Sequence, residues 1–326
     1  MKEVQFRQAV REAMSEEMKS NEDVFLMGEE VGEYEGAYKV TQGMLKEFGE
    51  KRVIDTPISE LSFAGIGVGA SMNETRPIVE FMTWNFALLA MDQVVNSAAK
   101  IYQMSGGQYN IPITFRGPNG QAGQLAATHS QSFEGFYAHV PGLKVITPST
   151  PYDAKGLLKS AIRDNDPVCF LESEKMYGDK GDIPEGEYVL PIGKADIKKE
   201  GNDVTIITFG KVIKTCYEAA DELEKEGYTS EIIDLRTIRP YDHQTIVESI
   251  KKTNRAVIVD ESWPVASMGS ELSHKIQFEA FDYLDAPIAK VNQSDTPFPF
   301  SPTLIEEAVP NKRRIMKAIR DVLYLN

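Results

Sequence analysis

The chain has little cysteine and little histidine, which removes several classes of site. Only Cys169 and Cys216 occur among 326 residues, far apart and without a CxxC pattern. This excludes a disulfide framework and a cysteine-based zinc site, and it is typical of a reducing compartment. None of the four histidines has metal-ligand spacing. The sequence therefore predicts neither a disulfide-stabilised fold nor a zinc centre.

Basic residues are also scarce relative to acidic ones. The chain has 35 Lys and Arg against 49 Asp and Glu, a net charge of −14. Such a surface repels phosphate backbones and anionic lipid, so we expect no nucleic-acid binding. The negative charge is explained either by a partner with a basic patch or by solubility alone. No stretch approaches about 18 uninterrupted apolar residues, so we expect no membrane span.

The first ten residues, MKEVQFRQAV, interleave charges and contain no apolar core, so we expect no signal peptide. The expected location is the cytoplasm, or the mitochondrial matrix if a transit peptide has been removed.

Short β-branched runs alternate with helical patterns, which predicts an α/β fold with mostly parallel sheets. The length favours two domains, and the polar, Gly- and Pro-rich stretch after residue 174 favours a boundary there. We predict domains at 1–185 and 203–326, a linker at 186–202 and a short strand at Tyr188–Ile192. The expected core strands are Val24–Met27, Arg52–Ile54, Pro77–Phe81, Pro112–Phe115, Leu143–Ile146, Val168–Leu171, Val204–Phe209, Glu231–Leu235, Ala256–Val259 and Ile288–Val291.

Two helices are informative. Residues Phe86–Tyr102 have apolar side chains at helical spacing and only Asp92 and Lys100 ionised. A helix that is apolar nearly all round must be covered on all sides, either by the core or partly by another subunit. The last helix is expected to begin near Pro310, because proline suits a first helical position.

The stretch Gly65–Ala70 matches the dinucleotide pattern GxGxxG/A. A dinucleotide loop needs its first glycine directly at a strand end, whereas here the predicted strand ends near Ile54. Small residues at this spacing instead let a helix approach its neighbours closely. This argues against a single-chain NAD-dependent dehydrogenase.

Glu60 is the candidate catalytic residue. It follows a predicted strand and opens a helical pattern, which places it at the carboxyl end of a parallel strand, where open α/β sheets bind ligands. Its neighbours Leu61 and Phe63 are apolar, so its carboxyl group can be desolvated, as proton-transfer catalysts require. Capping of the helix start is the structural alternative, and spacing alone does not decide between them.

Six strings of the sequence are informative together: Phe25–Lys39, Asp55–Gly69, Pro77–Asn85, Thr114–Asn119, His129–Gln131 and Ile232–Pro240. They lie in order along nearly the whole chain and resemble the beta subunits of the pyruvate dehydrogenase family of thiamine-diphosphate-dependent 2-oxo-acid dehydrogenases. The resemblance implies an N-terminal pyrimidine-binding domain and a C-terminal transketolase-like domain, both doubly wound. It also implies a coenzyme shared with an alpha subunit, which holds the diphosphate through Mg²⁺.

The resemblance assigns roles to individual residues. Glu60 matches the glutamate that hydrogen-bonds the pyrimidine nitrogen N1′. Ile58, Met82 and Phe86 match the pocket lining, for which plain core packing is the alternative. Glu29 matches an acidic residue near the coenzyme, in a chain of carboxylates linking two sites.

His129 matches a residue at the substrate end of the site, and a structural role is its alternative. A potassium site is a further expectation, with ligands that map to Ile113, Ala161, Ile162, Asp164 and Asp166. Other members have asparagine at the last of these positions, which leaves the ligand set open.

The absence of a GDG motif with a paired-asparagine segment indicates that this chain alone does not bind the diphosphate. The resemblance implies an alpha2beta2 heterotetramer and a C-terminal domain, around Leu284–Pro287, that docks the basic binding domain of a lipoyl acyltransferase. Pyruvate is the expected substrate, with branched-chain 2-oxo acids or acetoin as alternatives. A non-catalytic scaffold subunit is the remaining rival, and the intact string around Glu60 argues against it.

Overall fold

The computed structural model describes residues 1–325. It divides into two compact units. The first contains residues 1–122 and 136–192, and the second contains residues 123–135 together with the chain from Gly193 onward. The second unit thus takes a short segment from within the first unit's sequence.

The first unit is built on a parallel sheet with the strand order β6-β7-β5-β4-β2-β3. All six strands were predicted to within three residues, because each contains a β-branched or aromatic run buried between helices. The strands are β2 (Val24–Gly28), β3 (Val53–Asp55), β4 (Arg76–Glu80), β5 (Thr114–Pro118), β6 (Lys144–Ile146) and β7 (Val168–Glu172).

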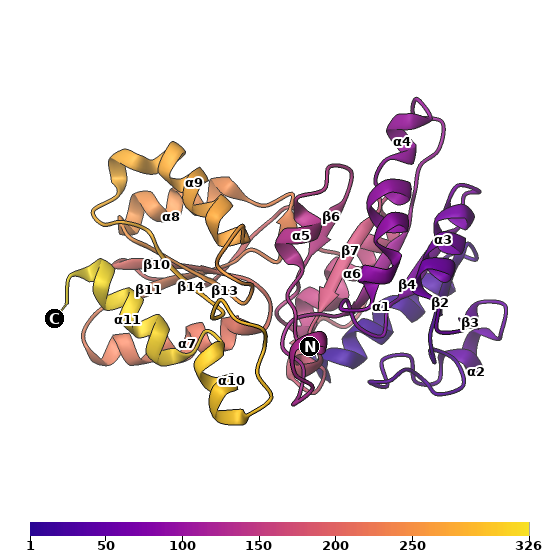
Figure 1. The fold of residues 1–326 in the computed structure, drawn as a ribbon, viewed down its shortest axis with the longest axis horizontal. Coiled ribbons are helices and arrows are strands. Elements are labelled where there is room, and N and C mark those ends of the chain that lie inside the picture. The colour runs from indigo at the N-terminus through magenta and orange to yellow at the C-terminus, as the bar shows by residue number, and fades with distance from the viewer. Residues whose placement is uncertain (326) are drawn as a thin grey trace. The chain divides into compact units, whose positions relative to one another are not determined.

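Helices cover both faces of this sheet (Figure 1). On one face, α1 (Phe6–Ser20) packs on α6 (Pro151–Arg163), and both share a core with inward residues such as Leu26 and Ile78. The alternate residues of the same strands face α3 (Glu60–Ser71). Here a Cβ built on Gly67 would lie 2.7 Å from Val79 Cγ2, so only glycine fits. The dinucleotide interpretation of these glycines is wrong, because all three lie inside α3 and not at a strand end. The close-packing role is confirmed for Gly65 and Gly67, whereas a Cβ on Gly69 would meet no atom within 4 Å.

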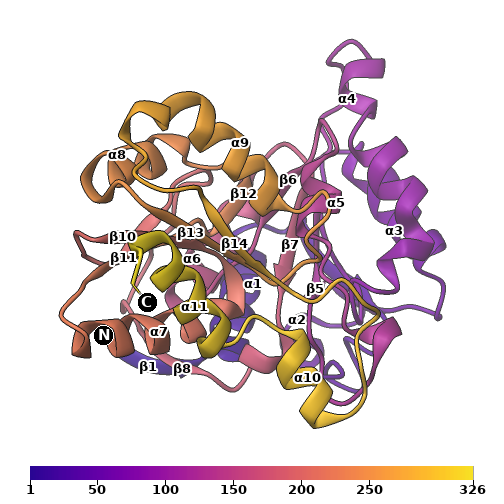
Figure 2. The ribbon, with the colours of Figure 1, turned by 60° about the vertical axis from the view of Figure 1, so that its left-hand side comes forward.

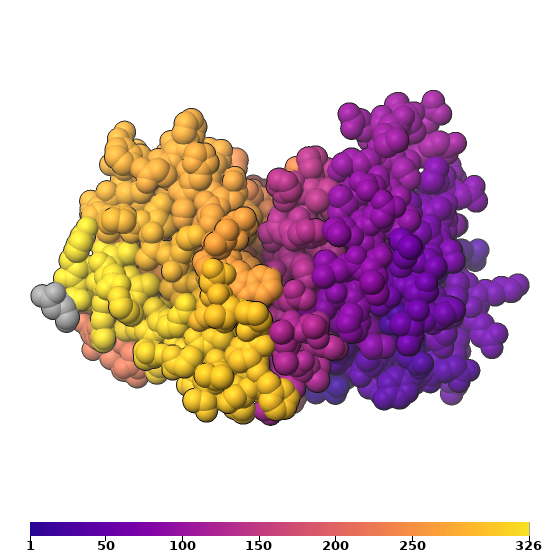
Figure 3. All heavy atoms as spheres, in the orientation of Figure 1, coloured from indigo at the N-terminus to yellow at the C-terminus, as the bar shows by residue number. Residues whose placement is uncertain are grey.

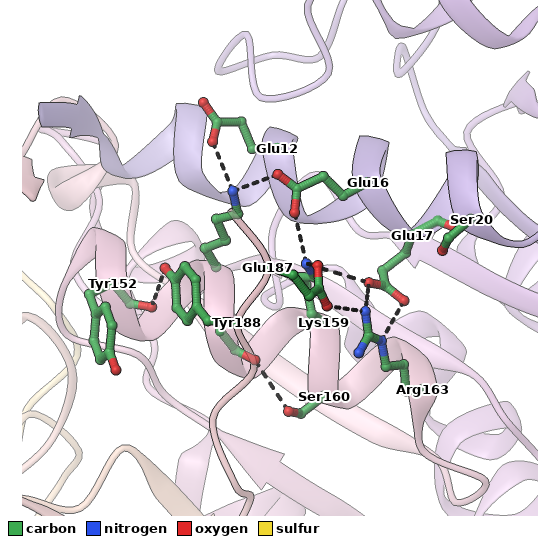
Figure 4. A network of polar contacts seen from close by, with 12 residues as sticks. Glu12, Glu16, Glu17, Ser20, Tyr152, Lys159, Ser160, Arg163, Glu187 and Tyr188 are labelled. Carbon is green, nitrogen blue, oxygen red and sulfur yellow. Dashed lines mark hydrogen bonds and ion pairs between the residues drawn. The ribbon is translucent and has the colours of Figure 1, made fainter. Parts of the chain in front are cut away.

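Ion pairs join α1 to α6 beside the apolar contacts (Figure 4). Lys155 and Lys159 are 1% and 0% exposed, and their ammonium groups lie 2.6 and 2.8 Å from the two carboxylate oxygens of Glu16. Arg163 binds both oxygens of Glu17 through Nε and Nη2, at 2.8 and 2.7 Å. Because the buried lysines are paired, α6 can have a charged face against α1 without unpaired buried charge.

The stretch Phe86–Tyr102 is not one regular helix. It contains a 3-10 turn (η1, Ala87–Ala90) and a π-helix (η2, Gln93–Ala98), followed by α4 (Ile101–Met104). Leu89 and Tyr102 are 64% and 52% exposed. The change of helix type shifts the apolar stripe round the axis, which the regular 3.6-residue period did not anticipate. Around α4 the chain projects from the first unit (Figures 1 and 3).

The second unit has a sheet in the order β14-β13-β10-β11-β9 (Figure 2). Its four predicted strands are confirmed, and they pair with one another in parallel. Helices α8 and α9 contact this sheet, as do α7 and α11 on the other face. The elements are β9 (Asp196–Lys199), β10 (Val204–Thr208), α7 (Ile213–Lys225), β11 (Ser230–Asp234), β12 (Thr237–Arg239), α8 (His243–Thr253), β13 (Ala256–Asp260), α9 (Met268–Ala280), β14 (Ala289–Asn292), α10 (Pro302–Ala308) and α11 (Lys312–Leu323).

Three sequence predictions near the boundaries need correction. Tyr188–Ile192 forms no strand; instead β8 (Lys180–Ile183) pairs antiparallel with β1 (Lys2–Gln5). Part of the expected 186–202 linker is β9, which pairs antiparallel with β11. The last helix begins at Lys312 and not at Pro310, since the Asn311 side chain caps it by accepting from the Arg314 amide. Among residues 1–325, no helix combines the length and apolar character needed to cross a bilayer.

Candidate active site

The candidate site lies at the carboxyl ends of β2, β3 and β4. Gly28 pairs with Asp55 on one side and with Glu80 on the other, so these three strand ends are adjacent. The chain leaves β2 for β3 on one side and later returns to β4 on the other, which makes this a topological switch point where doubly wound sheets bind ligands. Asp55 orders the loop after β2, because its carboxylate oxygens accept from the amides of Gly32 and Glu33 at 2.6 and 2.8 Å.

Two buried carboxyl groups meet in this crevice. Glu60 is the first residue of α3, Glu29 directly follows β2, and each is 4% exposed. Burial, the charge of Glu60 and a hydrogen bond with Glu60 together raise the pKa of Glu29 to about 7. Two carboxyl groups in hydrogen-bond contact must share a proton, so the pair holds one near neutral pH. The structure thus brings together the two acidic residues that the resemblance singled out.

Oε1 of Glu29 is buried and has no hydrogen-bond partner within residues 1–325. Buried polar atoms normally have a partner, and the exceptions concentrate at functional sites. The Glu29–Glu60 pair therefore fits a ligand that offers a nitrogen or a proton donor, as an aminopyrimidine does.

The raised pKa of Glu29 predicts a pH effect on stability. Its folded-state pKa of about 7 lies above the ordinary 4.5, so its contribution is fully present below 4.5 and is lost as pH rises through about 7. The wild-type chain should lose more thermal stability between pH 5 and pH 8 than Glu29→Gln does. Thermal denaturation at both pH values measures this, with the exposed Glu22→Gln as the control. Parallel losses in wild type and Glu29→Gln would refute the shift.

The three residues predicted to line the pocket differ in their exposure. Met82 and Phe86 are half-buried in the turn after β4, while Ile58 is 83% exposed. Leu61 and Ile66, on α3, are also exposed. Exposed apolar side chains on the elements that carry the acid pair are typical of a surface that another molecule covers.

A buried ion cluster under this turn was not predicted. Arg116 is fully buried and binds both carboxylate oxygens of Glu172 at 2.5 Å, as well as the carboxylate of Glu80. Its carbonyl accepts from the amide of Phe81, the first residue after β4. The cluster thus links the ends of β4, β5 and β7 beneath the Met82–Phe86 turn. The available signal was a charged residue within one predicted buried strand, Glu80, and one directly after each of two others, Arg116 and Glu172.

His129 belongs to the second unit, whereas Glu60 belongs to the first. It ends a 3-10 turn (η3, Ala127–His129) within residues 123–135, which we call the His129 segment. Its Nδ1 lies 3.0 Å from the hydroxyl of Thr128. A cavity of about 370 Å³ flanks the segment. It is lined by Ala127, Thr128, Gln131, Trp263, Asp295, Thr296 and Pro297.

Four of the expected potassium ligands, Ala161, Ile162, Asp164 and Asp166, lie at or just after the end of α6, whereas Ile113 directly precedes β5. However, protein cations already occupy this position. Arg76 donates to the carbonyls of Ile162 and Asp164 at 3.1 and 2.8 Å, and Lys144 lies within 3.0 Å of the carboxylates of Asp164 and Asp166. The carbonyls of Ile113 and Ala161 accept main-chain hydrogen bonds. Within residues 1–325, no cluster of three or more His, Cys, Asp or Glu side chains is arranged to hold a metal.

Two family models together match nearly the whole chain. The pyrimidine-binding domain of transketolase matches residues 2–180, and the C-terminal domain of transketolase matches residues 193–315. A solved split-gene transketolase, described as an inactive beta4 tetramer, has the same fold with a TM-score of 0.79, 20% identity and 99% of each chain covered. The predicted fold class, two transketolase-like α/β domains, is confirmed.

Relatives from bacteria and mitochondria are much more similar. The pyruvate dehydrogenase E1 component subunit beta of Rhizobium meliloti (strain 1021) is 55% identical over 98% of this chain and 69% of its own length. That of Rickettsia felis is 53% identical over 99% of both chains, and the mitochondrial protein of Bos taurus is 50% identical over 98% of this chain and 91% of its own. The chain belongs to the family of pyruvate dehydrogenase E1 component beta subunits.

Proposed function

We propose that this chain forms half of a thiamine-diphosphate site that decarboxylates pyruvate and transfers the acetyl group to the lipoyl group of an acyltransferase. The observation that carries this proposal is the buried Glu29–Glu60 pair at the switch point of a transketolase-type pyrimidine-binding domain. Family membership with proteins named for pyruvate dehydrogenase supports the substrate.

The residues of the site have different roles, according to their positions. When bound, thiamine diphosphate supplies the electron sink for decarboxylation. Glu60 would hold the coenzyme at N1′ of the pyrimidine ring, where its carboxyl group could take up or release a proton. Glu29 would stabilise the protonated form of the pair, and Met82 and Phe86 would line the ring. Ile58 belongs to the wall that is completed on assembly.

A second chain is part of the proposal. Exposed Ile58, Leu61 and Leu89 leave apolar surface around the acid pair that needs a cover. We propose that an alpha subunit covers this surface, holds the diphosphate through Mg²⁺, and assembles with this chain as alpha2beta2. On the second unit, exposed Phe278 and Tyr283 lie near Leu284–Pro287 in sequence, which supports this region as the docking surface for the acyltransferase.

Potassium remains a proposal for the end of α6. Each carbonyl oxygen there has a second lone pair, but Arg76 and Lys144 compete for the same acceptors. The ion would therefore bind through main-chain oxygens and not through the carboxylates of Asp164 and Asp166.

The experiment is co-expression with a candidate alpha subunit, followed by coenzyme binding and assays with pyruvate, branched 2-oxo acids and acetoin. We expect binding and turnover only in the assembled protein, with pyruvate preferred. Tight coenzyme binding by the isolated chain would contradict the shared site. A preference for acetoin or a branched 2-oxo acid would show that this compound, and not pyruvate, is the substrate.

His129 is proposed to act in acyl transfer to the lipoyl group. His129→Ala should lower reductive acetylation of lipoyl groups by about 10²-fold or more, a typical contribution of one positioned acid or base. Decarboxylation measured with an artificial electron acceptor should remain close to wild type. The exposed His243→Ala, outside the His129 segment, is the control. Normal acetylation by His129→Ala would refute the role.

A further inference from the structure

The loop that follows β2 carries Glu29 at its start, and the chain is fixed where it leaves the sheet. The carbonyl of Gly28 accepts from the amide of Thr56 at 2.9 Å, which joins the end of β2 to the residue after β3. A Cβ built on Gly28 would lie 2.5 Å from the carbonyl oxygen of Glu80, so the end of β2 also lies against the end of β4. The backbone before Glu29 is therefore held from both sides.

The backbone after Glu29 turns sharply. Glu30 has a φ of 59°, in the left-handed region that residues with a side chain rarely adopt. Its carbonyl accepts from the amide of Gly36 at 2.7 Å, which closes residues 30–36 into a compact turn that we call the Glu30 turn. Such a conformation persists only where surrounding contacts hold it, and residues held in this way cluster at functional sites. The contacts that hold the Glu30 turn therefore also fix the direction in which the chain presents Glu29.

Asp55 supplies these contacts. One of its carboxylate oxygens accepts from the Gly32 amide at 2.6 Å, and the other accepts from the Glu33 amide at 2.8 Å. Hydrogen bonds to an ionised acceptor are stronger than those between neutral groups. The carboxylate lies so close to the turn that a Cβ built on Gly32 would be 2.9 Å from Oδ2 of Asp55. Because Asp55 is the last residue of β3, it ties the Glu30 turn to the end of that strand.

Asp55 is also close in sequence to the other member of the acid pair. It ends β3, and Glu60 opens α3 only five residues later. The turn next to Glu29 and the segment that leads to Glu60 therefore meet at one carboxylate. Asp55 is exposed, whereas Glu29 and Glu60 are each 4% exposed. An exposed group thus holds the backbone on which two buried acids depend.

We propose that Asp55 is a positioning residue that sets the carboxyl group of Glu29 against that of Glu60 by holding the Glu30 turn on the end of β3. The hold itself follows from contacts of this chain alone. Its effect on turnover rests on the proposed function, because Asp55 acts there only through Glu29.

Hydrogen exchange of the enzyme assembled with its alpha subunit tests the hold. In Asp55→Ala the amides of Gly32 and Glu33 lose their acceptor, so residues 30–36 should exchange at least about tenfold faster, as the loss of a hydrogen bond to a charged group implies. Because Asp55 is exposed, its replacement opens no buried cavity, and the amides of β7 provide an internal reference for an intact first unit.

Two further variants complete the exchange measurement. Gly32→Ala should loosen the same residues by a second route, since its methyl group displaces the Asp55 carboxylate from the two amides. The exposed Asp23→Ala, just before β2, is the matched control and should exchange like wild type.

Pyruvate decarboxylation by the same assembled variants tests the positioning. Asp55→Ala should lower kcat by on the order of 10²-fold, a typical cost of a catalytic group displaced by about 1 Å. In a Glu29→Gln background the same change should cost little more, because the carboxyl group that Asp55 positions is already absent. A general loosening of the site would lower kcat equally in both backgrounds. Asp55→Asn keeps one acceptor oxygen but no charge, so it should retain more activity than Asp55→Ala if hydrogen bonds carry the effect.

The outcomes separate the hold from the proposed function. If residues 30–36 exchange at the wild-type rate in both Asp55→Ala and Gly32→Ala, the hold is wrong. If they exchange faster and kcat falls only where Glu29 is present, both the hold and the positioning stand. If kcat falls by the same factor in both backgrounds, or if Asp55→Asn is no better than Asp55→Ala, Asp55 does not position Glu29. If Glu29→Gln alone turns over at the wild-type rate, the role of Glu29 in the proposed function is overturned, and the exchange result alone decides the hold.

Discussion

Glu60→Gln should leave the fold and the assembly with the alpha subunit intact and lower pyruvate decarboxylation by on the order of 10³-fold or more. Glutamine has nearly the same shape and still accepts a hydrogen bond, but it cannot take up or release a proton at the pyrimidine nitrogen. Glu60 is buried at the first position of α3, so the change removes one charge from the crevice without opening a cavity. Single-turnover decarboxylation by the assembled enzyme measures the effect.

The exposed Glu50→Gln is the matched control and should retain wild-type turnover. Glu60→Gln also removes the charge that helps to raise the pKa of Glu29, so that pKa should fall from about 7 toward its ordinary value. The midpoint of the Glu29-dependent stability change would then move to lower pH. Near-normal decarboxylation by Glu60→Gln would refute the catalytic assignment, whatever happens to Glu29.

The sequence predicted the strands that are buried on both sides and missed those that are not. Val24–Gly28 and Ala256–Asp260 are continuous apolar runs, and such runs can be recognised locally. Lys2–Gln5 and Lys180–Ile183 are mostly polar, and they become strands only because residues far apart in sequence pair with each other. No local pattern contains that partner, so tertiary contact decides these elements.

In the candidate site, too, local sequence predicted some features, whereas others depend on tertiary contacts. The position of Glu60 followed from a strand and a helix that are adjacent in sequence. Its contact with Glu29 depends on β2 and β3 being neighbours, which the residues alone do not fix, and only the family resemblance pointed to Glu29. The resemblance also selected Ile58, which is 83% exposed in the chain, because it describes an assembled pocket.

Replacement of Arg116 should have the largest effect on stability. Arg116→Met has a similar length but leaves Glu80 and Glu172, which are 5% and 3% exposed, without their cation. Removing one partner of a buried ion cluster typically costs about 3–5 kcal/mol, because unpaired charge stays in a low-dielectric interior. We expect this loss in the free energy of unfolding of the first unit, measured by urea denaturation. Arg313→Met, which breaks an exposed pair with Glu307, should cost about 0–1 kcal/mol.

Unpaired charge, and not lost packing, should explain most of the stability that Arg116→Met loses. Two further measurements distinguish these two causes. Burial already raises the pKa of Glu80 to about 6 even beside Arg116. Without the arginine, which lowers the pKa of Glu80, this carboxyl group should bind a proton more readily, so the variant should regain stability as pH falls from 8 to 5. Adding Glu80→Gln and Glu172→Gln to Arg116→Met should likewise restore part of the loss at pH 8, because neutral amides need no cation. A cost that is the same at both pH values and unchanged by the amides would mean that the cluster stabilises these strand ends by packing alone.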